Sequence, residues 1–312
     1  MPLLSGPQKK HYIYNMNKKI IIAGGTGFVG KYFEKKFTEE GYQVIIISRQ
    51  PNHINWNDDQ GIVDALEGAE MLINLAGKSV NCRYNQKNMD EILNSRVRTT
   101  TQLGEAILKC KTPPPLWINS STATFYRHAE DHAQTESTGE KGKGFSVNVA
   151  TAWEKAFFSF TLPATRQAAL RIAIVLGKDG GVIKPFTNLV KLGLGGKQGN
   201  GKQMFSWLHI EDLYQMVLFI QKNPAYEGVF NCSSPNPITN SVLMKTFRKL
   251  MKAIIGLPAP KWMLKIGTAV IGSETELILK SRWVVPEKLL SLGYEFKYPI
   301  LEDALKNILN KD

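Results

Sequence analysis

The sequence predicts an α/β fold in which a doubly wound parallel sheet carries a smaller C-terminal lobe. Apolar runs of strand length recur along the first half of the chain, amphipathic helix patterns separate them, and three glycines at three-residue spacing follow the first run. With 312 residues and 43% apolar content, the chain is long enough for one large domain and an appendage.

The first unit is a strand, a glycine turn and a helix. Residues 19–23 begin with Lys19 and continue as four apolar residues, a pattern typical of a buried parallel strand, and an amphipathic helix pattern follows the turn. Gly24 permits the tight turn, Gly27 lets the backbone approach a diphosphate, and Gly30 lets the helix pack closely on the strand. The diphosphate would accept hydrogen bonds from the helix N-terminus, so this unit predicts a dinucleotide site.

The end of the second strand, in "YQVIIISRQ", indicates which dinucleotide binds. A site that prefers NAD carries Asp or Glu here to accept from the ribose 2′-hydroxyl, whereas this chain has Ser48 and Arg49. A guanidinium binds a 2′-phosphate through two parallel hydrogen bonds, so NADP(H) is favoured over NAD(H).

Two further apolar runs continue the predicted sheet. One covers residues 70–77, the other covers residues 114–126, and a helix pattern over 89–109 separates them. Because ligands of open parallel sheets lie outside the carboxyl ends of the strands, we expect these two ends to line the nicotinamide half of the cleft.

Together, "GGTGFVG", "INLAG" and "SSTATFY" resemble the extended and atypical short-chain dehydrogenase/reductase superfamily. The blocks "NSRVRTTTQL", "AWEKA", "LRIAIVLGKDGGVIKPF" and "LGLGGKQGNGKQMFSWLHIEDL", and a tail beginning "PAPKWMLK", narrow the resemblance to its nucleoside-diphosphate-sugar epimerase branch, which has a small C-terminal domain. The resemblance covers the chain from about residue 18 to its end.

The resemblance implies a Rossmann-type fold, bound NADP(H) and a substrate lobe built from the later segments. It places the glycines on the diphosphate, Arg49 on the 2′-phosphate, and Leu75 and Ala76 on the ribose side. The full expected cofactor set is Gly24, Thr26, Gly27, Phe28, Val29, Gly30, Ser48, Arg49, Asn74, Leu75, Ala76, Gly77 and Ser120.

The catalytic residues depart from the superfamily pattern. Thr122 falls on the catalytic Ser/Thr position, where its hydroxyl would hydrogen-bond the reacting oxygen. The superfamily's Tyr-x-x-x-Lys pair trades a proton with that oxygen, but Ser146 and Ala150 occupy the corresponding places. Tyr126, four residues after Thr122, either points into the cleft as a substitute or packs beneath its loop.

Residues 193–209 are the expected substrate loop. Five Lys and one Asp occur between residues 178 and 203, which indicates either a phosphate-attracting stretch or a solvated loop. We expect His209 to be structural and Asp212 to cap a helix over 211–222. The predicted substrate-binding residues are Lys197, Lys202, Gln203, Phe205 and Trp207.

Composition excludes several other classes. The net charge of +12 comes from scattered lysines without a nucleic-acid-binding motif, so anionic small molecules are the expected partners rather than nucleic acid. The three cysteines contain no C-x-x-C pair, so we expect neither disulfides nor a metal site. We expect no membrane span and a cytoplasmic location.

The expected domains are a leader over residues 1–15 that is disordered or not native, an NADP(H)-binding domain over 16–256 with inserted substrate-binding segments, and a small domain over 257–312 that closes over the cleft. Two functions stay open. One is an NADP(H)-dependent oxidoreductase or epimerase that acts on a sugar-nucleotide or other phosphate-bearing small molecule. The other is a non-catalytic NADP(H) sensor or scaffold. The oligomeric state is open as well.

Overall fold

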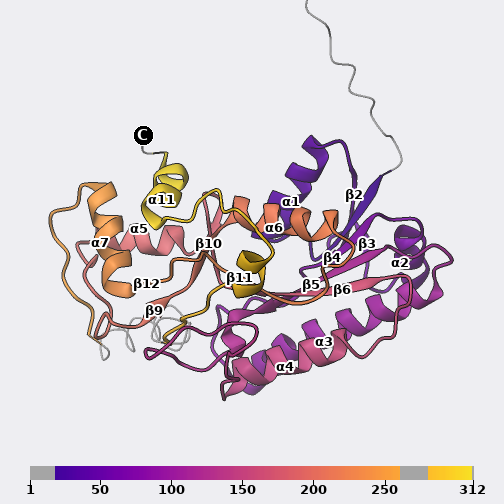
Figure 1. The fold of residues 1–312 in the computed structure, drawn as a ribbon, viewed down its shortest axis with the longest axis horizontal. Helices are drawn as coiled ribbons and strands as arrows, with labels where there is room; N and C mark the ends of the chain where they lie inside the picture. The colour runs from indigo at the N-terminus through magenta and orange to yellow at the C-terminus, as the bar shows by residue number, and fades with distance from the viewer. Residues whose placement is uncertain (1–17, 261–279, 311–312) are drawn as a thin grey trace, which may run out of the picture.

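The computed structural model describes residues 18–260 and 280–310, and Figure 1 shows how they are arranged. The central sheet has seven strands in the order β11-β6-β5-β4-β1-β2-β3, and every pair of neighbours is parallel. Its strands are β1 (Lys19–Ala23), β2 (Gln43–Ser48), β3 (Ile54–Asn55), β4 (Met71–Asn74), β5 (Leu116–Thr122), β6 (Arg166–Ile172) and β11 (Gly228–Cys232). The strand order reverses between β1 and β4, so a crevice opens at the carboxyl ends of these strands.

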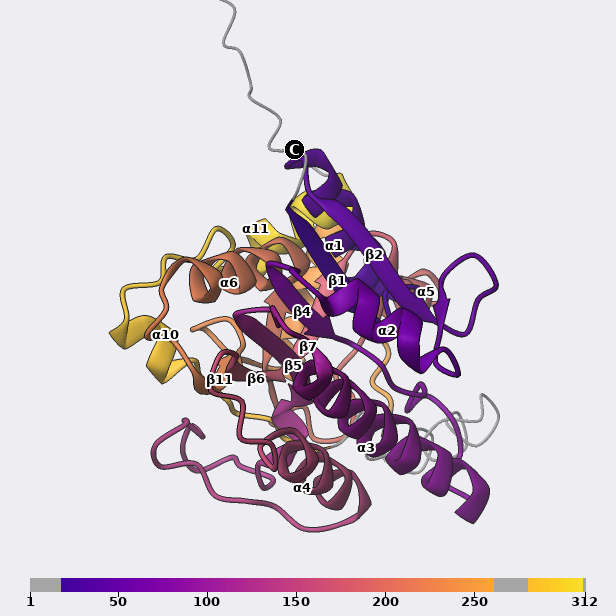
Figure 2. The ribbon, with the colours of Figure 1, turned by 90° about the vertical axis from the view of Figure 1, so that its right-hand side faces the viewer.

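Helices cover both faces of the sheet, which confirms the predicted doubly wound fold. In Figure 2, α1 and α6 lie on one side of the strands and α2, α3 and α4 on the other. Side chains of β1 alternate between the two layers: Ile20 and Ile22 join the core under α1 and α6, whereas Ile21 and Ala23 join the opposite core. These helices are α1 (Phe28–Glu39), α2 (Asp59–Leu66), α3 (Gln86–Lys109), α4 (Phe145–Phe157) and α6 (Ile210–Lys222).

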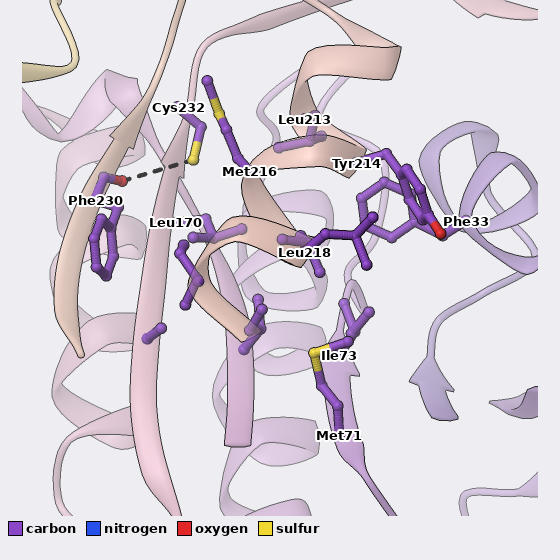
Figure 3. Close-up of a cluster of buried hydrophobic side chains, with 14 of the residues drawn as sticks. Phe33, Met71, Ile73, Leu170, Leu213, Tyr214, Met216, Leu218, Phe230 and Cys232 are labelled. Atoms are coloured by element: carbon purple, nitrogen blue, oxygen red, sulfur yellow. Dashed lines mark hydrogen bonds between the residues drawn. The ribbon is translucent and has the colours of Figure 1, made fainter. Parts of the chain in front are cut away.

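The α1–α6 layer fixes the first helix on the sheet. Phe33 of α1 packs edge-on against Tyr214 of α6, with 5.7 Å between the ring centroids. Figure 3 shows Phe33 and Tyr214 side by side, with other α6 side chains over the strand residue Leu170. The first helix therefore begins at a fixed position relative to the end of β1.

A second lobe packs beside the sheet (Figure 1), and it has its own apolar core. The C-terminal helix α11 joins this core and buries Leu301, Ala304, Leu305 and Ile308, the face that its sequence pattern predicts. Its elements are β7 (Ile174–Gly177), β8 (Gly180–Gly181), α5 (Ile183–Lys191), β9 (Met204–Phe205), β10 (Trp207–His209), β12 (Ile238–Thr239), α7 (Asn240–Met251) and α11 (Leu301–Leu309). A short 3-10 helix η1 (Ala123–Phe125) follows β5, and α10 (Glu287–Ser291) packs near β11.

The structure changes two details of the helix boundaries. The helix predicted over 89–109 begins at residue 86, because the Asn85 side chain caps it by accepting from the backbone N–H of Asn88. Asp212 does not cap α6: His209 does, through Nδ1 and the N–H of Glu211. The Asp212 carboxylate instead accepts from the backbone N–H groups of residues 297 and 298, which fastens the C-terminal segment to α6.

The expected leader lies outside the described residues, as do residues 261–279 and 311–312 of the segment expected to close over the cleft. Within the described ranges, no helix has the length and apolar character needed to cross a bilayer.

Candidate active site

The glycine turn after β1 is shaped by two close backbone contacts. Gly24 has φ +76°, and a Cβ there would lie 2.6 Å from the backbone of Ala76. A Cβ on Gly30 would lie 2.3 Å from the carbonyl oxygen of Gly25. Gly27 is different, because the atom nearest to its Cβ position is 4.0 Å away. Packing within the protein therefore requires glycine at residues 24 and 30, whereas residue 27 has open space beside it.

That open space lies at the start of α1. Gly27 is the N-cap, it has no side-chain capping bond, and the first helical N–H to find an acceptor is that of Lys31, bonded to Gly27 O at 2.9 Å. The amides of Phe28, Val29 and Gly30 have no acceptor within the helix. All three residues line a cavity of about 370 Å³, so the positive end of the helix dipole faces a space that can hold an anion.

The cavity extends from this turn across the carboxyl ends of β4 and β5. Of the predicted cofactor residues, the glycines, Phe28, Val29, Leu75, Ala76 and Ser120 line it, whereas Thr26, Ser48, Arg49 and Asn74 do not. Its described lining consists of Gly24, Gly27, Phe28, Val29, Gly30, Leu75, Ala76, Gly77, Val80, Tyr84, Ile92, Arg96, Ser120, Ser121, Thr122, Thr124, Phe145, Ser146, Val149, Trp153 and Ile172.

Asn74 shapes the cavity by holding the backbone of Ala76, which lines it. It is fully buried, and its Nδ2 donates to Asn119 Oδ1 at 2.7 Å and to Thr100 Oγ1 at 3.0 Å. Its Oδ1 accepts from the N–H of Ala76 at 3.0 Å. Asn74 therefore holds the segment after β4 against the glycine turn, and it does not itself line the cavity.

Ser48 is the last residue of β2 and Arg49 follows it, two strands from β4 at the same edge of the sheet. Ser48 is buried, and its Oγ lies 2.8 Å from His53 Nδ1 and accepts from the N–H of Gln50. The Arg49 side chain is exposed. Ser48 thus shapes the turn, and Arg49 is the group of this pair that can reach a ligand.

Three consecutive hydroxyls end β5, and the described contacts use them differently. Ser120 Oγ donates to the carbonyl of Asn74 at 2.9 Å, and Ser121 Oγ donates to Glu154 Oε1 at 2.6 Å. Thr122 Oγ1 accepts from the N–H of Thr124 at 3.1 Å. Within the described chain, Thr122 is therefore the one of the three whose hydroxyl proton has no acceptor, and it lines the cavity.

Tyr126 packs beneath its loop. Only 1% of it is exposed, its O–H donates to Asn231 Oδ1, and it accepts from Arg171, each at 2.9 Å. Burial raises the pKa of Tyr126 above its ordinary value, and the residue is not part of the cavity lining. This placement argues against the catalytic role that the sequence suggested, because the phenol is directed into a buried network.

That network centres on a buried ion pair. Arg171 binds Glu154 through two parallel hydrogen bonds of 2.9 and 2.8 Å, and both residues are less than 10% exposed. Since Glu154 also accepts from Ser121, the ion pair supports the end of β5 from below.

The places expected for the superfamily's Tyr and Lys lie on α4. Ser146 lines the cavity in the first turn of the helix, and Ala150 is fully buried one turn later. Neither side chain exchanges protons near neutral pH.

The wall formed by α3 and α4 carries groups to which the sequence analysis assigned no role. Arg96 of α3 stacks on Trp153 of α4, with its Cζ 5.1 Å from the ring centroid. Tyr84 lines the same wall and packs edge-on against Phe145. Arg96 lies in the quoted block "NSRVRTTTQL", one helical turn after the buried Ile92. That spacing places both residues on one face of the helix, and it is the sequence signal that could have identified Arg96.

The predicted substrate loop does not reach this cavity. Lys197 and Lys202 are exposed, and Gln203 is buried and donates to Gln198 O. Trp207 is fully buried in the core of the second lobe, and Phe205 packs against Phe186 there. In place of a stacking wall for a ligand, these two aromatic side chains form part of that lobe's core.

Comparison with known proteins identifies the family of this chain. The model of the NAD dependent epimerase/dehydratase family matches residues 20–233, and a domain of unknown function, DUF1731, matches residues 259–308. The mouse epimerase family protein SDR39U1 is 32% identical over 302 residues, covering 93% of this chain and 99% of its own length.

Two solved structures are similar over 94% of this chain. One is human SDR39U1 (isoform 2) with NADPH, with a TM-score of 0.86, 30% identity and all of that chain covered. The other is the nucleoside-diphosphate sugar epimerase from Corynebacterium glutamicum, with a TM-score of 0.76, 27% identity and 58% of that chain covered. These matches confirm the resemblance read from the motifs: the chain belongs to the NAD-dependent epimerase/dehydratase family and carries that family's fold with a C-terminal DUF1731 segment.

Proposed function

We propose that this protein is an NADP(H)-dependent oxidoreductase or epimerase that acts on a phosphate-bearing or sugar-like small molecule. The observation that carries the proposal is that one continuous cavity of about 370 Å³ joins the start of α1 at one end to Thr122 at the other. A dinucleotide bound along this path would bring its nicotinamide toward the residue that the superfamily pattern makes catalytic.

The residues present fit such a cofactor. The amides of residues 28–30 suit a diphosphate, and Gly27 leaves open the space that a Cβ would fill. The exposed Arg49 at the end of β2 suits a 2′-phosphate. The human relative crystallised with NADPH supports the choice of NADP(H). When bound, NADPH supplies a hydride donor.

Thr122 is the group we assign to the reacting oxygen. Because its Oγ1 accepts from the Thr124 amide, its own proton is directed to another acceptor. A substrate carbonyl or alkoxide oxygen in the cavity would take that hydrogen bond, and the interaction strengthens as negative charge develops on the oxygen.

Binding and turnover test the proposal in sequence. The purified protein is titrated with NADPH, NADP⁺, NADH and NAD⁺, and NADPH oxidation is then followed over a panel of carbonyl compounds and nucleotide sugars. Thr122→Val should lower kcat by roughly 100-fold while leaving the NADPH Kd unchanged, and Thr122→Ser should keep most of the activity. The absence of turnover across the panel by cofactor-loaded protein would refute the enzymatic assignment.

A second candidate, a non-catalytic NADP(H) sensor or scaffold, is favoured by one observation: Ser146 and Ala150 stand where the superfamily has its proton-transferring pair. Affinity purification of bound proteins with NADP⁺-loaded, NADPH-loaded and cofactor-free protein tests it. Partners that change with the cofactor state would support the sensor, and identical recovery in all three states would exclude it.

A further inference from the structure

Arg96 contributes the one charged side chain to the described lining of the cavity. The other described lining residues are apolar or neutral polar, and no Asp or Glu is among them. The nearest acidic side chain on the same helix, Glu91, is paired with Lys78. A guanidinium thus faces a largely apolar space with no opposite charge from the described lining.

The guanidinium is held in place by its neighbours. Nη1 donates to the carbonyls of Ile92 at 2.9 Å and Lys78 at 3.1 Å. Trp153 covers the group from α4, and a Cβ on Gly77 would lie 3.0 Å from Cζ. Trp153 is fixed in turn, because its Nε1 donates to Thr100 Oγ1 at 2.9 Å.

These contacts use one nitrogen of three. Within the described chain, Nη2 and Nε of Arg96 have no acceptor. Burial lowers the pKa of Arg96 to about 10, so the group stays charged at neutral pH and keeps part of the desolvation cost of a cation with no anionic partner in the described lining. An oxyanion that bound both nitrogens would offset that cost.

We propose that Arg96 binds a carboxylate or phosphate group of the substrate, so that the substrates of this site are anionic at the end that meets the α3–α4 wall. The diphosphate site proposed above lies at the start of α1, after β1, whereas Arg96 lies beside the segment after β4 and against α4. The proposal rests on the function proposed above, because it assigns this wall to the substrate.

Small aromatic probes test the site without a known substrate. Benzoate and phenyl phosphate carry the two candidate oxyanions on a ring that suits the apolar wall, and benzamide is their neutral analogue. Binding to NADP⁺-loaded protein is measured by saturation-transfer NMR at constant ionic strength. We expect at least one of the two anions to bind about tenfold or more tightly than benzamide, and the preferred anion distinguishes a carboxylate substrate from a phosphate one.

Variants of two arginines on α3 test whether Arg96 is responsible for the anion binding. Arg96→Gln should weaken binding of the preferred anion about tenfold or more, Arg96→Lys should weaken it less, and Arg98→Gln should leave it unchanged, because Arg98 is exposed on the same helix and outside the lining. Equal anion binding to wild type and Arg96→Gln would overturn the proposal, as would benzamide binding as tightly as both anions.

Two further measurements keep the result interpretable. NADPH affinity is measured for each variant: if Arg96→Gln loses it, the guanidinium serves the cofactor and the proposal fails. If wild type binds no dinucleotide, the proposed function fails, but binding of the anions to wild type and Arg96→Gln is still measured and still tests the Arg96 site. If Arg96→Gln does not fold, phenylglyoxal labelling of wild type replaces it: the preferred anion should protect Arg96 and not Arg98, and equal labelling with and without the anion would contradict the site.

Discussion

Gly27→Ala separates cofactor binding from folding, because residue 27 is the glycine of the turn whose Cβ position is empty. The nearest atom would be 4.0 Å away, and the φ of −81° is ordinary for alanine. The remaining cost is that alanine caps a helix less well than glycine, so we expect the free energy of unfolding to fall by about 1 kcal/mol or less.

The effect on the cofactor should be much larger. The methyl group would occupy the space beside the amides of Phe28 and Val29, where the diphosphate is expected. Hydrogen bonds to a charged group contribute about 1.5–3 kcal/mol each, so displacing the phosphate from two amides should cost about 3 kcal/mol, or roughly 100-fold in the NADPH Kd.

Gly30→Ala is the matched contrast. Its Cβ would lie 2.3 Å from Gly25 O, so the helix start must shift, and we expect unfolding free energy to fall by about 2–3 kcal/mol. Urea denaturation without cofactor and fluorescence titration with NADPH measure the two effects. A Gly27→Ala protein that binds NADPH within about threefold of wild type would refute the reasoning, since the diphosphate would then not occupy this turn.

Three further variants follow from single contacts. Arg49→Ala should weaken NADPH about tenfold or more and leave NADH unchanged in a fluorescence titration; equal loss for both would remove the 2′-phosphate assignment. Glu154→Gln breaks the buried pair with Arg171 and should cost about 3–5 kcal/mol of unfolding free energy by urea denaturation, whereas Glu302→Gln, which removes the exposed partner of Lys249, should change that free energy little. Burial lowers the pKa of His209 to about 4, whereas the unfolded chain takes up the proton as pH falls below 6.5. The free energy of unfolding of the wild type should therefore fall by about 3 kcal/mol between pH 6.5 and pH 4. His209→Asn keeps an acceptor for the helix cap and should not show this fall.

The fold and the place of the cavity beside the glycine turn could be predicted because they depend on local patterns. Buried parallel strands are largely continuous apolar runs, so the sequence pattern predicts β1, β2, β4 and β5. The carboxyl ends of these parallel strands meet at one edge of the sheet. The spacing of Gly24, Gly27 and Gly30 then identifies the strand edge at which a diphosphate would bind.

The substrate half depends on contacts between distant segments. Glycines and lysines at 193–203 indicate a loop without saying where it docks, and the structure packs that loop on residues 257–259 through backbone bonds such as Gly196 N to Leu257 O. Tyr126 follows the short helix η1, which turns the chain and directs the phenol beneath the sheet edge. Arg96 is placed by the packing of α3 on α4, where Trp153 is more than fifty residues away in the sequence.

The pH dependence of any reaction in the cavity depends on which side chains of its lining can take up or release a proton. A Tyr-Lys pair makes a dehydrogenase rate rise with pH as the phenol ionises, but Ser146 and Ala150 hold those places, and Thr122 and Arg96 do not titrate between pH 6 and 9. With a substrate whose charge is constant in that range, kcat should therefore vary by about twofold or less from pH 6 to 9. Steady-state NADPH oxidation across that range measures it, with the NADPH Kd at each pH as the control for cofactor binding. A steep limb with an apparent pKa inside the window would show that a titrating group takes part in the reaction, and the assignment of the chemistry to Thr122 alone would have to be abandoned.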